Sequence, residues 1–271
     1  MATFVESVTE RDAPRSRNTL DEDEEEEAHL ALHSKPQAVP ELHLKDGRTL
    51  RTGTLQLGIV TIGMELSRFV ESCVQINSID VVGDLVADKS RAKLSYIGVE
   101  SPTIAWLAFE SIDGLEEHAL WGWAKSVIEA LGDVKHVCIL DTVFTYNYLC
   151  NGERCEPPLV RSLATNEASQ ELSEKLGIKI LESGNLITGL TAALISECSF
   201  NTQIDTCVSL LSLRESQLGS ETLLALIEPF LSLLKPFDSQ NNTFLNEFGS
   251  AQNSCAQIRE ARGADRNLLY M

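Results

Sequence analysis

Side chains that could do chemistry are few in this chain. The best carboxylate candidate is Asp141, which directly follows an apolar run from Val134 to Leu140. Ligand sites of α/β proteins gather where buried strands end, so an aspartate there is a candidate acid or base. The sequence shows no partner for it. Gly-x-Ser-x-Gly, Gly-x-Gly-x-x-Gly and Gly-x-x-x-x-Gly-Lys are all missing, so neither a serine nucleophile turn nor a phosphate-binding loop is indicated.

Histidine and cysteine show no spacing typical of a catalytic or metal site. The five histidines are scattered, and we interpret them as structural: His29, His33, His43, His118 and His136. Three of the seven cysteines lie in apolar runs and are expected to be buried free thiols, which fits a reducing compartment: Cys138, Cys198 and Cys207. Cys150 and Cys155 form a close pair without further ligands nearby, so we predict no metal and no cofactor.

The C-terminal end combines apolar side chains, an aromatic ring and the terminal carboxylate. We predict that four residues there bind a partner: Leu268, Leu269, Tyr270 and Met271. Residues 259–267 before them are polar, so the apolar tip stands on a polar stalk. Such a tip suits a pocket and its carboxylate suits a cation, and capture of a chain end is a known mode of peptide recognition. The alternative is that the tip folds back onto the protein's own core.

The rest of the chain alternates between strand and helix patterns. Leu55 to Ile62 is a nearly continuous β-branched and apolar run, as expected of a strand buried on both faces, and Gly63 then leads into a helix. Further strands are predicted at 80–87, 93–98, 103–109, 134–140, 161–164, 178–181 and 204–213. Helices are predicted at 64–74, 116–131, 167–176 and 220–234. The pattern predicts a three-layer α/β sandwich with a central, mostly buried sheet flanked by helices.

Four segments are less regular. We predict a turn at 45–48 that opens a short edge hairpin, and a helix kink or break at Pro229. Residues 144–158 read as an irregular loop, whose Tyr146 and Tyr148 either contact a partner or pack over the sheet edge. A modest amphipathic helix is predicted at 244–262, leading out to the apolar tip.

The chain is strongly acidic, with a formal net charge of -18. Residues 1–50 hold 12 acidic and 6 basic side chains, so most of the charge lies beyond them. This balance argues against nucleic acid as a partner and favours a basic protein surface. We divide the chain into an acidic, disordered N-terminal region (1–52), an α/β domain (53–237) and a C-terminal helix and tail (238–271). The N-terminal region is either a solvated tail or an acidic arm that touches a basic partner.

Neither a signal peptide nor a membrane span is expected. Residues 1–10 lack a basic stretch followed by an apolar run, and no apolar run reaches the ~20 residues that cross a bilayer. We therefore expect no membrane partner and a cytoplasmic location, with the nucleus as a second compartment.

Three features together resemble the proteasome assembly chaperone 1 family over about residues 55–271. The first is Ile-Val-Thr-Ile-Gly at 59–63, which runs into a helix with Phe-Val at 69–70. The second is Asn-Leu-Ile-Thr-Gly-Leu at 185–190, before the strand at Ile204. The third is the terminal Leu-Tyr-Met at 269–271, and an acidic run at 21–27 accompanies all three.

The resemblance implies a noncatalytic chaperone with a layout related to that of nucleoside phosphorylases and flexible termini. It implies a heterodimer with proteasome assembly chaperone 2, which sits on the seven-membered α-ring of the 20S core particle and promotes its assembly. In this family a C-terminal hydrophobic–Tyr–any-residue motif enters a pocket between adjacent α-subunits, where a lysine pairs with the terminal carboxylate. Carried onto this chain, the motif is Leu269, Tyr270 and Met271.

A second hypothesis comes from a different class of protein. An α/β enzyme acting on a nucleoside or small ester would need a deep polar pocket around Asp141, at the end of the strand that begins at Val134. A solid, apolar sheet end at that place would exclude it.

Overall fold

The fold is taken from a computed structural model. It describes residues 39–45, 48–50, 53, 55–87, 90–98, 102–112, 115–149, 158–214, 218, 220–238, 244–246 and 252. The chain divides into two units, Met1–Gln37 and Ala38–Met271, and every described residue belongs to the second.

The centre of the domain is a sheet of eight described strands, in the order β1-β3-β4-β5-β2-β6-β8-β7. The strands are β1 (Glu41–Leu44), β2 (Leu57–Ile62), β3 (Ile79–Ala87), β4 (Ser90–Ile97), β5 (Ile104–Phe109), β6 (His136–Phe144), β7 (Val160–Ala164) and β8 (Thr206–Arg214). β5, β2, β6 and β8 are parallel to one another, while β1, β3, β4 and β7 join them by antiparallel pairing. All four parallel strands therefore end at the same edge of the sheet.

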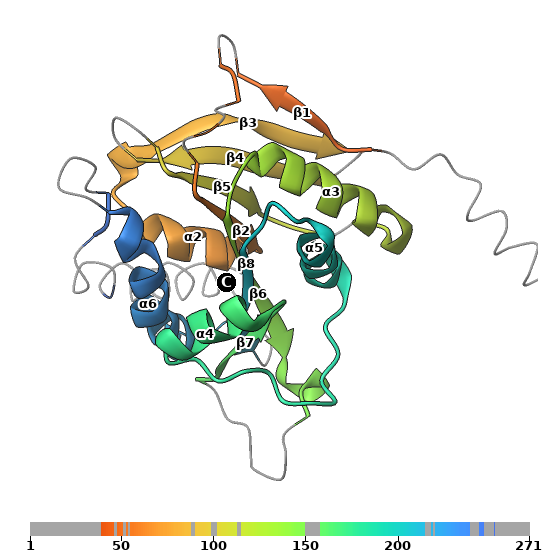
Figure 1. The fold of residues 1–271 in the computed structure, drawn as a ribbon, viewed down its shortest axis with the longest axis vertical. Coiled ribbons are helices and arrows are strands. Elements are labelled where there is room, and N and C mark those ends of the chain that lie inside the picture. The colour runs from red at the N-terminus through yellow and green to blue at the C-terminus, as the bar shows by residue number, and fades with distance from the viewer. Residues whose placement is uncertain are drawn as a thin grey trace, which may run out of the picture. The chain divides into compact units, whose positions relative to one another are not determined.

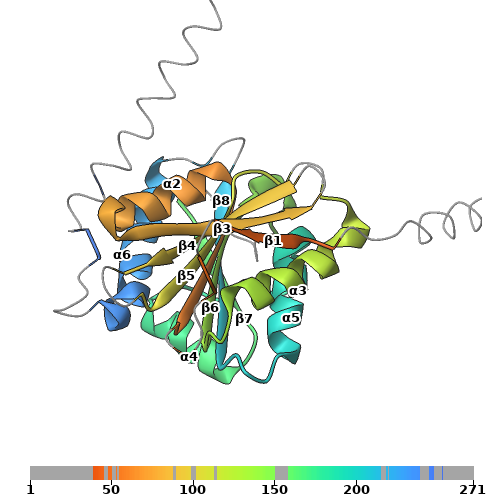
Figure 2. The same ribbon diagram turned by 90° about the horizontal axis from the view of Figure 1, so that it is seen from above.

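Helices cover both faces of this sheet (Figures 1 and 2). One face carries α2 (Met64–Cys73), α4 (Glu167–Lys175) and α6 (Ser220–Leu234), and the other carries α3 (Leu120–Leu131) and α5 (Gly189–Phe200). Short 3-10 turns are η1 (Ile76–Ser78), η2 (Glu117–Ala119), η3 (Thr145–Asn147) and η4 (Lys235–Phe237). The predicted three-layer α/β sandwich is confirmed. None of the helices that the structure describes is long and apolar enough to cross a membrane.

β2 is the strand that the sequence predicts to be buried on both faces. All six residues of β2 are buried, and the strand pairs in parallel with β5 on one side and β6 on the other. A run of Leu, Ile and Val without polar alternation is typical of a parallel strand that is covered on both faces. Gly63 ends it with φ 106°, which a glycine adopts without strain, and the chain turns there into α2.

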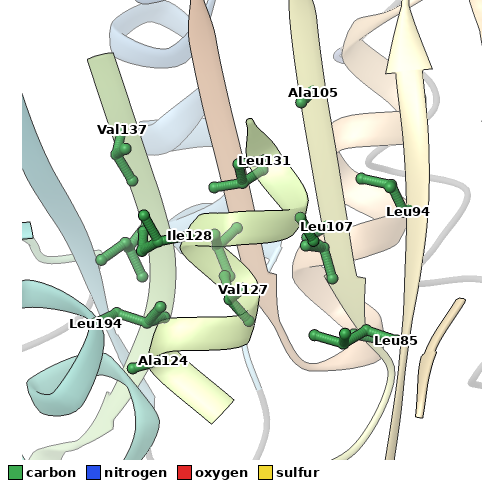
Figure 3. Packing of buried hydrophobic residues seen from close by; sticks show 14 of the residues in the cluster. Leu85, Leu94, Ala105, Leu107, Ala124, Val127, Ile128, Leu131, Val137 and Leu194 are labelled. Atoms are coloured by element: carbon green, nitrogen blue, oxygen red, sulfur yellow. The ribbon is translucent and has the colours of Figure 1, made fainter. Parts of the chain in front are cut away.

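A hydrophobic core lies on each face. On one, Val127, Ile128 and Leu131 of α3 pack toward Leu107 of β5 and Val137 of β6 (Figure 3). Complete burial of such a side chain stabilises the fold by about 1.5–3 kcal/mol. On the other face the rings of Phe69 (α2) and Phe230 (α6) lie 5.4 Å apart.

A buried polar chain ties this second core to the start of α2. The indole nitrogen of Trp106 donates to the Thr61 hydroxyl at 3.1 Å, which in turn lies 2.9 Å from the hydroxyl of Ser67. Ser67 donates to the carbonyl of Gly63 at 3.1 Å. β5, β2 and α2 are thereby held in a fixed register at the edge where the parallel strands end.

The predicted edge hairpin is wrong in its pairing, because the edge strand β1 pairs with β3. Arg48 N–H donates to the Lys45 carbonyl at 2.9 Å, as in a turn, but β1 pairs antiparallel with β3. Gly83 of β3 permits that pairing, since a Cβ there would lie 2.5 Å from the His43 carbonyl oxygen. β1 lies inside the predicted N-terminal region 1–52, so the sheet begins before the boundary drawn at residue 53. The rest of that division stays a prediction.

Four other segments differ from the prediction. β6 extends to Phe144, because its last residues pair with β8 up to Arg214. α6 continues through Pro229, so the predicted break is wrong, while a kink there stays a prediction. At Leu245, where a helix was predicted to begin, the chain forms a bridge with Val74 at the end of α2. Ile180 makes a single bridge with Ser162 in place of a strand.

Candidate functional site

A cavity of about 580 Å³ lies at the edge where the four parallel strands end. Its walls come from the ends of β2, β6 and β8, the residues after β5, the beginning of α2 and the loop that leads into α5. Ligands of open α/β sheets bind at this edge, outside the carboxyl ends of the strands. The sheet end around Asp141 is therefore hollow, as the enzyme hypothesis requires.

Asp141 lies in the wall of this cavity, where β6 approaches α5. The Thr191 hydroxyl donates to its Oδ2 at 2.5 Å, and the Thr142 backbone N–H donates to its Oδ1 at 2.6 Å. Burial raises the pKa of Asp141 to about 6, although both hydrogen bonds and the charge of Arg214 oppose the rise. Asp141 thus has the partner that the sequence did not reveal, in the first turn of α5.

The raised pKa makes Asp141 a cost to stability at neutral pH. Between about pH 4 and 6 the native carboxyl keeps a proton that the unfolded chain has released, so stability falls as pH rises through that window. Asp141→Asn removes this cost and keeps an acceptor for Thr142 N–H. We expect it to raise Tm by about 2–4 °C at about pH 7.5, which corresponds to about 1 kcal/mol, with little change near pH 3.5. Equal shifts at both pH values in calorimetry would contradict this.

Arg214, at the end of β8, brings a positive charge to the cavity. Its guanidinium carbon lies 4.1 Å from the centroid of the Phe144 ring, and that ring stacks on Tyr146 at 5.0 Å. Arginine over an aromatic face is attracted by the ring quadrupole, which holds the side chain in place. The Nε atom of Arg214 is buried and has no hydrogen-bond partner among the described residues.

A half-buried polar cluster fixes the two loops beside the cavity. Arg161 Nε donates to Glu182 Oε1 at 2.8 Å, and the Tyr148 hydroxyl also donates to Glu182. Burial alone would raise the pKa of Glu182, but the hydrogen bonds from Arg161 and Tyr148 outweigh it and lower the pKa to about 2. Asn185 adds a second tie, because its side chain accepts from Leu149 N–H at 2.6 Å and donates to the Leu149 carbonyl at 3.0 Å.

Of the two predicted roles, packing over the sheet edge is confirmed for Tyr148, and partner contact stays a prediction for Tyr146. Tyr148 is buried at the sheet edge, whereas Tyr146 is 74% exposed. Tyr146 therefore remains available to a partner.

The cavity wall is rich in acidic and hydroxyl side chains. The lining residues that the structure describes include acidic side chains, Arg214 and hydroxyl groups, but no histidine, cysteine or lysine. Asp141 thus faces no histidine or lysine with which to share proton transfer. A pocket beside Asp141 is what the enzyme hypothesis predicted, whereas the sequence analysis did not single out Arg214.

Other candidates from the sequence lie apart from this cavity or outside the described residues. Leu268, Leu269, Tyr270 and Met271, like Cys150 and Cys155, belong to the second group. His136 Nδ1 lies 2.9 Å from the Thr206 hydroxyl, between two strands. Cys138, Cys198 and Cys207 are buried free thiols. Within the described part of the chain, no group of three His, Cys, Asp or Glu side chains could hold a metal ion.

Comparison with known proteins gives matches of structure. No protein-family model matches the sequence, and no curated protein does. The fold is similar to that of PbaB from Pyrococcus furiosus, an archaeal proteasome activator, with a TM-score of 0.60 and 11% identity over 85% of this chain and 100% of that chain. PbaA of the same organism, a homolog of proteasome-assembly chaperone, gives a TM-score of 0.56 and 15% identity over 82% of this chain and 94% of that chain.

A third match is a Thermoplasma acidophilum protein of unknown function, with a TM-score of 0.51 and 14% identity over 78% of this chain and 85% of that chain. At these identities the likeness establishes the fold, which this chain shares with the two Pyrococcus proteins along nearly their whole length.

Proposed function

We propose that this protein is a noncatalytic chaperone of proteasome assembly. The observation that carries the proposal is the shared fold, because the chain covers all of PbaB and 94% of PbaA. PbaB is an archaeal proteasome activator, and PbaA is an archaeal homolog of proteasome-assembly chaperone. The C-terminal Leu-Tyr-Met supports it independently, because a likeness of folds does not depend on those three residues.

The proposed mode of action is docking onto the α-ring of the 20S core particle. Leu269 and Tyr270 fill a pocket between adjacent α-subunits, and the carboxylate of Met271 pairs with a lysine there. Leu268 contacts the rim of that pocket. Burial of a Leu or Tyr side chain supplies about 1.5–3 kcal/mol before ordering costs, so the tail alone binds weakly.

A second contact is needed for firm binding. A heterodimer with proteasome assembly chaperone 2 provides it, since two linked contacts on one ring raise the overall affinity by their effective concentration. The net charge of -18 favours approach to basic surfaces of the α-subunits.

An assembly assay tests this function. Proteasome α-subunits of the protein's own source are mixed with the full chain and its partner chaperone, and seven-membered rings are counted on native gels. The proposal predicts capture of α-subunits and faster appearance of rings. If the chain neither captures α-subunits nor speeds the appearance of rings, the proposal is wrong. Stimulated peptide hydrolysis by mature 20S particles, with assembly unchanged, would assign the chain to the activator role of PbaB instead.

A further inference from the structure

The two edges of the sheet differ in what covers them. At the β7 edge a further segment is paired, because Ser162 N–H donates to the Lys179 carbonyl at 2.9 Å and Leu181 N–H donates to the Ser162 carbonyl at 2.8 Å. At the opposite edge β1 is the outermost strand (Figure 1), and within the described part of the chain it pairs only with β3. An open strand edge is a template for pairing with another chain.

The backbone of β1 shows which of its groups face outward. Lys45 N–H donates to a carbonyl of β3 at 2.8 Å, and the His43 carbonyl also faces that strand. Successive residues of a strand direct their backbone groups to opposite sides, so Leu42 and Leu44 direct theirs away from the sheet. β1 therefore offers two N–H donors and two carbonyl acceptors along its outer side.

Both ends of β1 are fixed by hydrogen bonds. At its start the Ser126 hydroxyl of α3 donates to the Pro40 carbonyl at 3.4 Å. After its end Arg48 N–H donates to the Lys45 carbonyl at 2.9 Å, and the Arg48 guanidinium donates twice to Asp80, at 2.7 and 2.8 Å. An edge that is already ordered loses little conformational entropy when a second strand pairs with it.

The sequence of this edge is complementary to itself. Two copies placed antiparallel about His43 bring Leu42 of each copy opposite Leu44 of the other. The outward N–H and C=O groups then meet in pairs and form four hydrogen bonds between the copies. The same register sets Glu41 of each copy opposite Lys45 of the other, and opposite charges that face each other across strands are favourable.

Neighbouring registers lose this fit. A register centred on Leu42 sets Pro40 opposite Leu44, and proline has no N–H to donate. A shift of one residue between the copies sets outward backbone groups opposite inward ones, so the hydrogen bonds are not made. The register about His43 also covers apolar surface, because Leu42 packs against the core under α3 and Leu44, on the same face, is 36% exposed.

We propose that the β1 edge pairs with a second copy of this chain, in a two-fold dimer whose sheet is continuous through His43. Each copy contributes one short strand, so the contact lies at the small end of protein interfaces and the dimer is weak, with a Kd of about 10–100 µM. The inference concerns the isolated chain and does not rest on the proposed function.

Charge reversal tests this pairing in sedimentation equilibrium of the full chain at about 5–300 µM. Salt at about 0.15 M screens the repulsion between two chains of net charge -18. The wild type should pass from monomer to dimer over this range. Glu41→Lys or Lys45→Glu sets like charges opposite each other twice in the dimer and should weaken dimerisation about tenfold.

Combining the two reversals should restore the dimer. In an equimolar mixture of the Glu41→Lys and Lys45→Glu chains, each lysine of one chain faces a glutamate of the other. The double variant restores the same pairs within one sequence. The matched controls are Glu228→Lys and Lys235→Glu, since both residues are exposed near the far end of the sheet and change the net charge equally. Both controls should dimerise like the wild type.

A cross-link reports on the register itself. His43→Cys places two thiols opposite each other at the two-fold axis, with Cβ atoms about 4.5–5.5 Å apart, so mild oxidation should give a covalent dimer on a non-reducing gel. Glu41→Cys should not, because the two copies of that residue lie four residues apart along the strands, about 14 Å. The wild type gives the background from its seven native cysteines.

Three results would overturn the proposal. One is a full chain that stays monomeric up to about 300 µM, as it would if its N-terminal residues occupied the edge. Another is a mixture of the two single variants that dimerises no better than either alone. The third is a Glu41→Cys cross-link as efficient as that of His43→Cys. No proteasome subunit enters these measurements, so their outcome is separate from that of the assembly assay.

Discussion

Removal of Leu268 to Met271 should weaken capture of proteasome α-subunits by about 100-fold or more, while the fold stays intact. The loss follows from the apolar area of Leu269 and Tyr270 that no longer enters the pocket, at about 1.5–3 kcal/mol each. Tyr270→Ala alone should cost about 30-fold. Binding of purified α-subunits by surface plasmon resonance gives these ratios, and calorimetry of the same samples shows whether Tm is unchanged.

Two controls make this result specific to the motif. Met271→Ala keeps the terminal carboxylate and should change binding by less than about threefold, because that side chain has no pocket in the proposed contact. One glycine added after Met271 displaces the carboxylate and should weaken binding nearly as much as the truncation. If truncation lowers Tm and leaves capture unchanged, the tip packs against the protein's own core and its docking role is wrong.

Glu182→Ala should destabilise the domain by about 3 kcal/mol, the usual cost of leaving a buried charge without its partner. The Arg161 side chain is only 10% exposed and would keep only the Tyr148 hydroxyl and the carbonyl of Val160, to which it donates at 3.1 Å, with no carboxylate to balance its charge. For a domain of this size the loss lowers Tm by about 6–12 °C. Hydrogen exchange at Leu149 should also quicken, since the loop that Tyr148 anchors is released.

The acid response and a double mutant test the same cluster. Because the pKa of Glu182 is lowered to about 2, its contribution is complete above about pH 4.5 and is lost as pH falls toward 2. Glu182→Gln should therefore differ from the wild type at neutral pH and approach it in acid. Arg161→Ala with Glu182→Ala should cost less than the two single changes added together. Strict additivity would show that the two side chains do not interact.

Much of the fold followed from the sequence because its strands and helices differ in hydrophobic period. β2 is a nearly continuous apolar run and α3 presents one apolar face, so each pattern indicates one type of secondary structure. β1 was missed because its four residues alternate too briefly to indicate a strand, and only its pairing with β3 makes it one. The last residues of β6 looked like a loop after Asp141, since the sequence does not show that β8 pairs alongside them.

The candidate site also has one residue that local sequence indicated and others that it did not. Asp141 could be found because a carboxylate at the end of a buried strand follows from local pattern alone. Its partner Thr191 lies 50 residues further on, so no local pattern connects the two side chains. Arg214 meets Phe144 only through the register of β6 and β8. Such meetings depend on the order of strands in the sheet, which no single stretch of sequence contains.

The position of β2 in the sheet also governs how the chain can fold as it is synthesised. β2 is the first strand of the parallel group, yet its neighbour β5 follows only after β3 and β4 have been made, and its neighbour β6 only after α3 as well. Contacts between distant segments slow folding, because the loop between them must close first. β2 therefore lacks β6, its second neighbour, while more than a quarter of the chain emerges, an interval in which an unpaired strand edge favours aggregation.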